Sequence, residues 1–366
     1  MKKNLFILVT VTLFLCMISG CRPKNPVDMP EPTPGPDVTE PPTPAYSIAD
    51  YFPFQENTLY KYIGVGSDFL TQDEFMLYAN DSGAQILASN IDHDINTDVY
   101  RMEDGKLKVI FMSYEYFYDN LLDTADIKNM TILQEPLELG RTWPYDSEGA
   151  ISEITNLNAK TIVPLGEFDA LEVTTTHYDV VRRDYYAPGV GLIQTSYDLG
   201  STKISRDLSE IIWNASKTVE IDICVVNTTL GRLEFEKRPL TLTSNIDFVQ
   251  YFNTLLKEPL PVDYQPMLPG NSSIRSMSVD WPNVLLTVDL SKDYVQNIDV
   301  GAGIESDMLQ ALANTLGNFY NVWNVEILLD GNRYESGHIL RHEGEYWEVE
   351  PVVYPEPEPV APPQGS

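Results

Sequence analysis

The chain has 366 residues, of which 43% are hydrophobic, enough to build two folded domains. Its 54 acidic residues outnumber 24 Lys and Arg residues and give a formal charge of −30. The sequence has no cluster of basic residues to replace the counterions of phosphate groups, which argues against a nucleic-acid partner.

The first 21 residues predict export and membrane anchoring. Two lysines precede the apolar run 5–18, and small residues then lead to Cys21. This is the pattern of a secretory signal peptide, which we place at residues 1–20. The sequence ISGC at 18–21 resembles the bacterial lipobox, and the resemblance implies cleavage before Cys21 and lipid attachment to it. The acyl chains of such a cysteine are enough for stable anchoring, here at the extracytoplasmic face of the cell membrane.

Two Pro-rich segments flank the part of the chain that can fold. Residues 21–45 contain the lipid anchor and an acidic linker with too little apolar surface for a core, so we expect an extended spacer. Residues 351–366 have a similar composition and predict a disordered tail. If Cys16 leaves with the signal and Cys21 carries lipid, Cys224 is left without a disulfide partner, and we expect it to be a small packed residue.

Residues 46–215 predict an all-β domain. Segments such as NTLYKYIGV (57–65) and KLKVIFMSYEYF (106–117) alternate or run apolar over the length of strands, and turn signals such as Asp104–Gly105 separate them. Within this range, no long stretch has apolar residues at the 3.6-residue spacing of a helix. We expect an antiparallel meander or an open barrel.

The segment DHDINTDVYRME (92–103) is a weak candidate calcium loop. Positions 1, 3, 5, 7 and 12 of a helix–loop–helix calcium site match Asp92, Asp94, Asn96, Asp98 and Glu103. The sixth position, however, is a threonine where the sharp turn requires glycine, and the flanking residues are typical of strands. We therefore favour a solvated acidic loop, and we predict neither a metal site nor a cofactor.

Two aromatic segments, 112–120 and 182–188, allow two interpretations. Their tyrosines are able to stack on a glycan or peptide in a groove. They also fit a cross-strand aromatic ladder that stabilises the meander, which is the interpretation we favour because strand composition alone predicts it.

Residues 216–350 predict an α+β domain with two helices on a small sheet. Strands are expected at 218–226, 231–242, 273–280, 283–291 and 322–332. The helix near 244–258 has Ser244 or Asn245 as its expected cap, and the helix at 304–319 has one apolar stripe. That stripe consists of Met308, Leu312, Leu316 and Phe319.

Several phrases in this range, in the same order, resemble the GerMN domain of sporulation and spore germination. They are NTLLKEPLP (253–261), SIRSMSVDWPNVLLTVDLSKDYV (273–295), the segment 301–331 and the closing GHI (337–339). The resemblance implies a compact α/β fold, a non-enzymatic role in the bacterial cell envelope, and work through assembly with other envelope proteins. It leaves open a homo-oligomer formed through this domain.

In the stretch 284–295 an alternating apolar strand ends in Asp289, Ser291 and Lys292, polar residues that raise the question of a catalytic site. Nucleophilic catalysis requires a base beside the serine, and the local sequence supplies none. Turn chemistry accounts for each of these residues, so we expect a structural strand end.

We expect a lipid-anchored extracytoplasmic adaptor that binds other envelope proteins, by strand addition at an exposed sheet edge. The alternative is a binding lipoprotein whose β-rich domain captures a glycan, a peptide or a lipid. An enzyme ranks third, because no base, nucleophile and orienting group are found together in the sequence.

Overall fold

The computed structural model describes residues 46–90, 95–124, 127–200 and 202–354. The predicted signal peptide, Cys21 and the linker up to residue 45 lie outside this part of the chain and remain predictions. Asp92 and Asp94 of the candidate calcium loop and residues 355–366 of the predicted tail also lie outside it. Within the described ranges, no helix combines the length and the apolar character needed to cross a bilayer.

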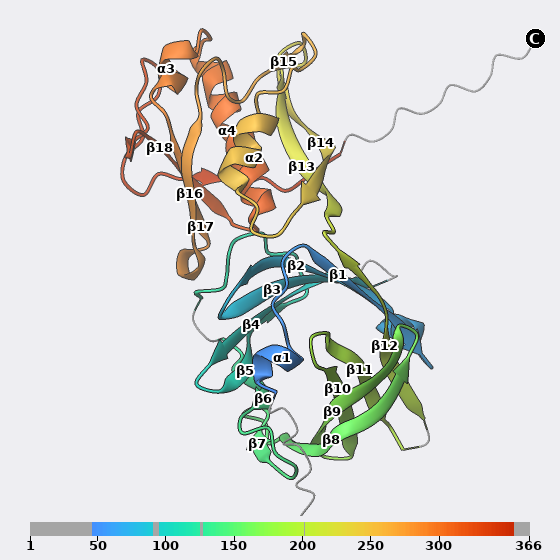
Figure 1. Ribbon diagram of the computed structural model, residues 1–366. Coiled ribbons are helices and arrows are strands. Elements are labelled where there is room, and N and C mark those ends of the chain that lie inside the picture. The colour runs from blue at the N-terminus through green and yellow to red at the C-terminus, as the bar shows by residue number, and fades with distance from the viewer. Residues whose placement is uncertain (1–45, 91–94, 125–126, 201, 355–366) are drawn as a thin grey trace, which may run out of the picture. The chain divides into compact units, whose positions relative to one another are not determined.

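In the described part of the chain, twelve antiparallel strands form one sheet in the N-terminal region (Figure 1). They are β1 (Thr58–Val65), β2 (Gln72–Asn80), β3 (Gly83–Asn90), β4 (Ile95–Glu103), β5 (Lys106–Ser113), β6 (Met130–Gln134), β7 (Thr142–Pro144), β8 (Ile151–Val163), β9 (Gly166–His177), β10 (Val180–Ala187), β11 (Gly191–Asp198) and β12 (Lys203–Trp213). The short helix α1 (Ile48–Tyr51) precedes them, and the 3-10 turn η1 (Asp68–Leu70) links β1 to β2.

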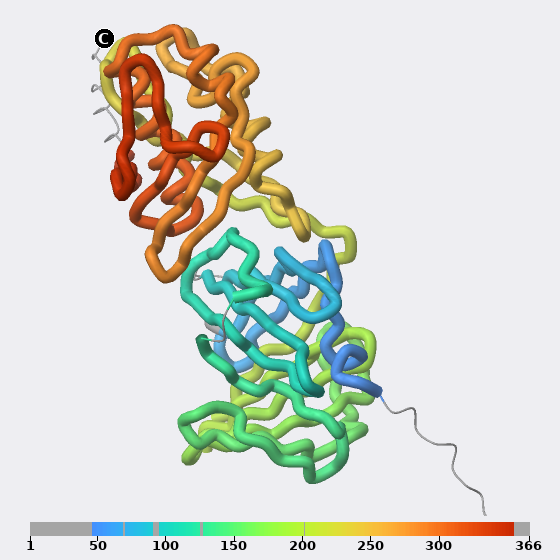
Figure 2. The backbone as a smooth tube through the Cα atoms, turned by 90° about the vertical axis from the view of Figure 1, so that its left-hand side faces the viewer, coloured from blue at the N-terminus to red at the C-terminus, as the bar shows by residue number. Residues whose placement is uncertain are grey.

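The strand order is β6-β5-β4-β3-β2-β1-β12-β11-β10-β9-β8-β7, so consecutive strands pair except β6 with β7, and β1 also pairs with β12. The two edge strands, β6 and β7, are therefore consecutive in the chain. Figure 2 shows the backbone of the protein turned by 90° from Figure 1. The Thr131 amide donates to the Tyr145 carbonyl at 2.8 Å, and Trp143 Nε1 donates to the Thr131 carbonyl at 3.0 Å. The predicted antiparallel meander is confirmed, and the sheet is nearly closed.

The C-terminal region confirms the predicted α+β class. Its elements are β13 (Lys217–Asn227), β14 (Arg232–Leu242), α2 (Phe248–Leu255), β15 (Tyr264–Gln265), β16 (Ile274–Asp280), η2 (Trp281–Asn283), β17 (Leu285–Leu290), α3 (Asp293–Asn297), α4 (Ala302–Phe319), β18 (Asn324–Leu329), β19 (Asn332–Arg333) and β20 (Trp347–Glu348). The strands divide between two sheets, ordered β14-β13-β15 and β16-β17-β18-β19, with β20 paired to β18. β17 and β18 run parallel, and the connection between them contains α3 and α4.

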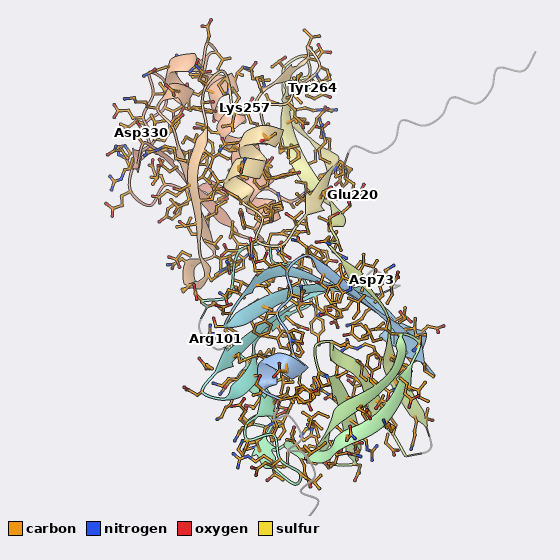
Figure 3. The ribbon with its side chains drawn as sticks, in the orientation of Figure 1. Asp73, Arg101, Glu220, Lys257, Tyr264 and Asp330 are labelled. Atoms are coloured by element: carbon orange, nitrogen blue, oxygen red, sulfur yellow. The ribbon has the colours of Figure 1, made fainter. Side chains whose placement is uncertain are left out.

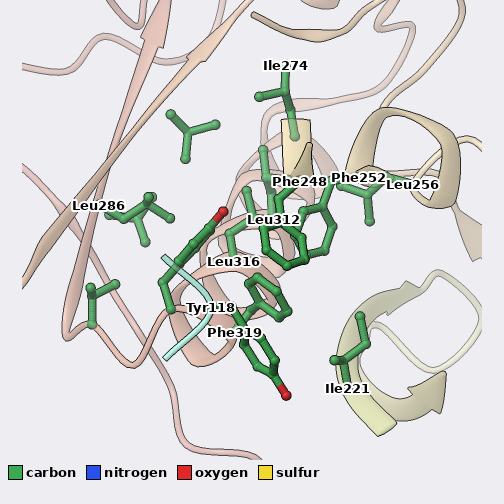
Figure 4. Packing of buried hydrophobic residues seen from close by; sticks show 14 of the residues in the cluster. Tyr118, Ile221, Phe248, Phe252, Leu256, Ile274, Leu286, Leu312, Leu316 and Phe319 are labelled. Carbon is green, nitrogen blue, oxygen red and sulfur yellow. The ribbon is translucent and has the colours of Figure 1, made fainter. Parts of the chain in front are cut away.

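Helix α4 carries the apolar stripe that the sequence predicts. Met308, Leu312, Leu316 and Phe319 are all buried, and they share one hydrophobic core with Phe248 and Phe252 of α2 (Figure 4). Tyr118, from the loop after β5, reaches into the same core and stacks on Phe319 with ring centroids 4.4 Å apart. This core therefore draws side chains from both regions, which lie in one compact unit of the chain.

The predicted cap of the first helix is wrong. Helix α2 begins after Asp247, whose side chain accepts a hydrogen bond from the Gln250 amide at 3.1 Å. Ser244 and Asn245 are not available as caps because they bind the N-terminal sheet. Ser244 Oγ accepts from the Asn57 amide at 2.6 Å, and Asn245 Nδ2 donates to the Ala79 carbonyl at 3.1 Å.

Candidate binding groove beside strand β13

A groove of about 560 Å³ runs along the first half of β13. The consecutive residues 217–222 form one wall, and Asn318 and Phe319 at the end of α4 contribute to another. Tyr116 and Tyr118 complete its aromatic lining. Because six consecutive strand residues line it, the groove presents the backbone edge of β13 as well as side chains. We call this feature the β13 groove.

The hydrogen bonds of β13 define which amides face the groove. β13 pairs with β14 along its whole length, but with β15 only at Val226 and Asn227. The Cys224 amide donates to Thr315 Oγ1 of α4 at 2.9 Å, so it faces away from β14. Along an antiparallel strand the amides alternate in direction, so the even-numbered residues of β13 all face this side.

A proline on the partner strand agrees with this assignment of the even-numbered residues to the groove side. Glu220 lies opposite Pro239, which has no amide hydrogen and so fits only a pair whose backbone groups point away from each other. Thr218, Glu220 and Asp222 therefore turn their backbone N–H and C=O groups to the groove. Among the described residues, none pairs with these six groups. Figure 3 labels Glu220 on this strand.

The opposite edge of the same sheet is less suited to binding a strand. β14 carries Pro239 together with Glu234, Glu236 and Arg238, and charged residues and proline are the usual protection of an exposed strand edge. Arg238 and Glu236 also pair with each other at 2.6 Å. The β13 edge has the better-formed groove and the aromatic lining.

The charge of the β13 groove is mainly negative. Its lining includes the carboxylates of Glu115, Glu220 and Asp222 and one ammonium group, that of Lys217. Lys217 Nζ donates to Ser89 Oγ at 3.1 Å and lies 5.8 Å from the centre of the Tyr116 ring. Its charge is therefore directed to the wall of the groove.

The start of the C-terminal tail reaches the rim of this groove. Asn318 Nδ2 of α4 donates to the Glu350 carbonyl at 3.0 Å, and the Tyr354 hydroxyl donates to Asp222 Oδ1. Lys237 of β14 lies over the Tyr354 ring at 5.3 Å. The contact raises the pKa of Tyr354, through partial burial first and then through its hydrogen bond to Asp222.

The candidate calcium loop is only partly described. Asn96, Asp98 and Glu103 all lie on strand β4, where Asn96 Nδ2 donates to Asp98 Oδ2 at 3.1 Å and Glu103 pairs with Lys108 at 2.7 Å. Of the residues that the structure describes, no three His, Cys, Asp or Glu side chains gather as a metal site. The strand geometry leaves the described part of this segment engaged in hydrogen bonds and an ion pair.

Asp289 and Ser291 secure the end of strand β17. Asp289 Oδ1 accepts from the Gly331 amide at 2.7 Å, and its Oδ2 pairs with Arg275 at 3.1 Å. Ser291 Oγ accepts from the Ser273 amide at 3.1 Å. These contacts tie together the ends of β16, β17 and β18, in agreement with the structural interpretation of this segment.

The two aromatic segments have different roles. Tyr116, Phe117 and Tyr118 lie in the loop after β5, so the cross-strand ladder does not describe them, and two of them line the β13 groove. Tyr186 lies on β10 and is 1% exposed in the core of the nearly closed sheet. The sequence placed both segments on strands because it shows composition but not where the strand ends.

The interior of the N-terminal sheet also contains a small cavity. Its volume is about 30 Å³, and its lining includes Tyr60, Tyr62 and the ion pair of Arg206 with Glu74, at 2.9 Å. Such a volume holds one or two water molecules, whereas small-molecule sites usually measure roughly 300–1,000 Å³. The ligand-binding alternative therefore receives less support from the geometry than binding in the β13 groove.

Glu305 forms a separate buried cluster at the start of α4. Its carboxylate accepts from the Tyr334 hydroxyl at 2.8 Å and contacts His338 Nδ1 at 2.9 Å. Burial opposes the charge, but hydrogen bonds from Ser336, Tyr334 and His338 lower the pKa of Glu305 below its usual value. The cluster fastens the segment after β19 to α4.

Cys224 behaves as the sequence predicts. It is buried, forms no disulfide among the described residues, and burial raises the pKa of its thiol to about 12. A thiol with such a pKa is unreactive, so Cys224 serves packing.

Comparison with known proteins connects the C-terminal region to a family. The family model Germane, described as sporulation and spore germination, matches residues 226–335. Residues 226–335 form a GerMN-like domain. The predicted resemblance is thereby confirmed. The GerMN-like domain contributes α4 to the β13 groove, while Thr218, Glu220 and Asp222 precede the matched range.

Solved structures include three similar chains. Tandem GerMN domains of the sporulation protein GerM from Bacillus subtilis are 18% identical with a TM-score of 0.27, covering 32% of this chain and 41% of that chain. A candidate exported protein with a YmcC-like fold from Bacteroides fragilis is 15% identical with a TM-score of 0.28, covering 44% and 98%. A candidate lipoprotein from Clostridium perfringens is 16% identical with a TM-score of 0.22, covering 33% and 79%. A search of curated proteins found no match.

Proposed function

We propose that this protein is a lipid-anchored, extracytoplasmic adaptor of the bacterial cell envelope, without enzymatic activity and linked to sporulation or spore germination. In this proposal Cys21 carries the lipid, and the linker 21–45 holds the folded part away from the bilayer. The β13 groove then binds an extended segment of another envelope protein. The match of residues 226–335 to a sporulation family and the lipobox-like start support this assignment.

The open edge of β13 is the observation that carries the proposal. Three residues present backbone groups that no described residue pairs with, along a groove of about 560 Å³ next to the aromatic rings of Tyr116, Tyr118 and Phe319. In strand addition, main-chain hydrogen bonds supply affinity while neighbouring side chains supply specificity. The groove offers both, and the described residues that line it include no histidine or cysteine for a catalytic pair.

Site-specific photo-cross-linking tests this function in cells. A photoreactive amino acid replaces Thr218 in the full-length anchored protein, and the matched control carries it at Thr241, which lies directly opposite Thr218 on β14. We expect Thr218 to give discrete cross-links to one or two envelope proteins, and Thr241 to give none of them. Cultures are irradiated during growth and during sporulation.

Two results would contradict the proposal. Identical cross-link patterns from Thr218 and Thr241 would show that the edge of β13 has no special role. An absence of protein cross-links from Thr218, in cells where the same method traps a known envelope complex, would remove the adaptor function.

A further inference from the structure

We infer that the segment bound at the β13 edge is a short strand of another protein in which basic residues alternate with apolar ones. This inference rests on the proposed function and specifies its partner. The edge at 217–222 is about 20 Å long, so it accommodates about six residues of an added strand.

The backbone determines that the partner is extended. Thr218, Glu220 and Asp222 each present one donor and one acceptor to the groove, at the two-residue spacing of a strand. Beyond them the ladder is already completed, by Thr315 at Cys224 and by β15 at Val226. The open section thus has a defined end, and a strand is the conformation whose backbone matches it.

The side chains of β13 specify alternation in the partner. Val219 and Ile221 point to one face. Ile221 belongs to the hydrophobic core that contains Phe319 (Figure 4), and Val219 packs against this core. Thr218 and Glu220 are exposed on the other face. An added strand places successive side chains next to these two faces in turn, so apolar residues match the first and polar residues match the second.

The charge of the groove selects basic residues for the polar positions. Glu115 and Glu220 line the groove and have no ion pair among the described residues, whereas Asp222 is paired with Lys237 at 3.6 Å. The charge of Lys217 is directed to Ser89 and Tyr116. Cross-strand pairs of opposite charge stabilise a sheet, and like charges directly opposite destabilise it. A partner with Lys or Arg on this face therefore complements the site.

The protein's own tail is a poor occupant, although it begins at the rim of the groove with Tyr354. Its sequence from residue 355 is PEPEPVAPPQGS. Proline at every second position from 355 to 359 removes the donors that a ladder needs. Glu356 and Glu358 would also add negative charge beside Glu220 and Asp222.

Peptide binding to the full-length protein, purified in detergent, tests the inference. The probe is a fluorescent octapeptide of sequence TKVKVKVT, compared with TEVEVEVT and with a version that carries proline at the first two valines. Thr218→Pro removes an outward-facing donor of β13, and Thr241→Pro is its matched control on the outer edge of β14. Glu220→Lys tests the charge.

We expect TKVKVKVT to bind and both other peptides to bind at least about tenfold more weakly. Thr218→Pro should weaken binding by roughly five- to tenfold and Thr241→Pro should leave it unchanged. Glu220→Lys should weaken the binding of the basic peptide by roughly threefold or more. Equal affinity for the basic and acidic peptides, or equal effects of the two proline variants, would overturn the inference.

Mapping the cross-linked segment separates this inference from the proposed function. If Thr218 cross-links to an envelope protein at a segment without basic residues, the inference fails while the adaptor function stands. Cross-links from Thr218 to residues 355–366 would assign the edge to the protein's own tail, and cross-links to a second copy would make it a self-association site. Either of these outcomes overturns the inference.

Discussion

Asp98 lies on β4 in the interior of the N-terminal sheet, beside Glu74 and Arg206. Its Oδ1 oxygen is buried and has no hydrogen-bond partner among the described residues, although the residue as a whole keeps some exposure. Burial raises the pKa of Asp98 to about 7, and the charge of Glu74 adds to this, against the hydrogen bond from Asn96 and the charge of Arg206. The folded protein therefore retains this proton over a pH range in which the unfolded chain has lost it.

Asp98→Asn should accordingly stabilise the protein at high pH. An aspartate in an unfolded chain has a pKa of about 4, so between pH 4 and 7 the folded state binds more protons and the free energy of unfolding decreases as pH rises. The variant lacks this titration, so we expect it to exceed the wild type by about 2 kcal/mol or more at pH 8 and to converge with it near pH 4.

Urea unfolding at pH 4, 6 and 8 measures this difference. The exposed Asp68→Asn is the control, with little change expected at each pH. A gap between wild type and Asp98→Asn that stays constant from pH 4 to 8 would show that Asp98 does not titrate as described.

Glu305→Ala should strongly destabilise the protein. Tyr334 is fully buried, and its hydroxyl would lose its carboxylate partner, which costs roughly 2–4 kcal/mol together with the lost contact to His338. Because the pKa of Glu305 is lowered in the fold, its contribution is present above the unfolded pKa and is lost as pH falls through the folded value.

Thermal unfolding at pH 7 and below pH 4 follows this effect. The control is Glu343→Ala, because the Glu343 side chain is 88% exposed and pairs only at the surface with Arg333. The loss of thermal stability caused by Glu305→Ala should become smaller toward low pH. An equal loss at both pH values would contradict the stabilising role of the Glu305 charge.

At the scale of elements, β13 has one edge in a ladder and one edge that, over its first half, pairs with no residue in the part of the chain that the structure describes. Thr218→Pro should therefore be tolerated, since its amide faces the groove. Val219→Pro should cost about 3 kcal/mol or more, because its amide faces β14 and proline removes that hydrogen bond. Chemical unfolding of the two variants, whose substitutions are one position apart, shows whether the odd-numbered residues of β13 direct their amides to β14. The reverse order of stabilities would place the open amides on the odd residues.

The helices illustrate what local sequence reveals. The 3.6-residue stripe predicted α4 with all four of its named core residues, because periodicity reports directly on a buried face. The cap of α2 was predicted wrongly, since Ser244 and Asn245 have the chemistry of caps but are bound to residues about 165 to 190 positions earlier in the chain. Competition from such distant partners leaves no local signal.

The same limit applies to the β13 groove. The alternation TVEID predicted a strand with one polar face, but the open edge depends on where β15 stops and where α4 ends. Those boundaries result from tertiary packing. The candidate calcium loop shows the converse, because Asn96, Asp98 and Glu103 have the right spacing in sequence and yet lie on an extended strand.

At the scale of the whole molecule, the formal charge of −30 bears on the proposal that Cys21 carries a lipid. Such a charge gives no electrostatic attraction to anionic lipids, so under this proposal membrane attachment depends on the acyl chains. Cys21→Ala should therefore remove lipid label and move the protein out of the membrane fraction. Fractionation with a radiolabelled lipid precursor measures both, and Cys224→Ala is the control that should keep both. A Cys21→Ala protein that stays with membranes without lipid would contradict the anchoring proposal.

The two folded regions are joined by a shared core, and Tyr118 is central to it. Its ring is 8% exposed, stacks on Phe319 and packs edge-on against Phe248 at 6.1 Å, while Tyr78 donates to its carbonyl at 2.9 Å. Tyr118→Ala removes the aromatic contacts but leaves the backbone acceptor. We expect a loss of about 3 kcal/mol from the cavity and the lost stacking.

Tyr118→Ala should also reduce the cooperativity of unfolding between the N-terminal sheet and the GerMN-like domain. Calorimetry of the variant should show a broader or divided transition where the wild type shows one. Tyr114→Ala, four residues earlier in the chain and 84% exposed, is the matched control and should unfold like the wild type. If both variants lose the same stability, or if the wild type itself already unfolds in two separate steps, then Tyr118 does not couple the two regions. The walls of the β13 groove, which Tyr118 also lines, would then move independently of each other.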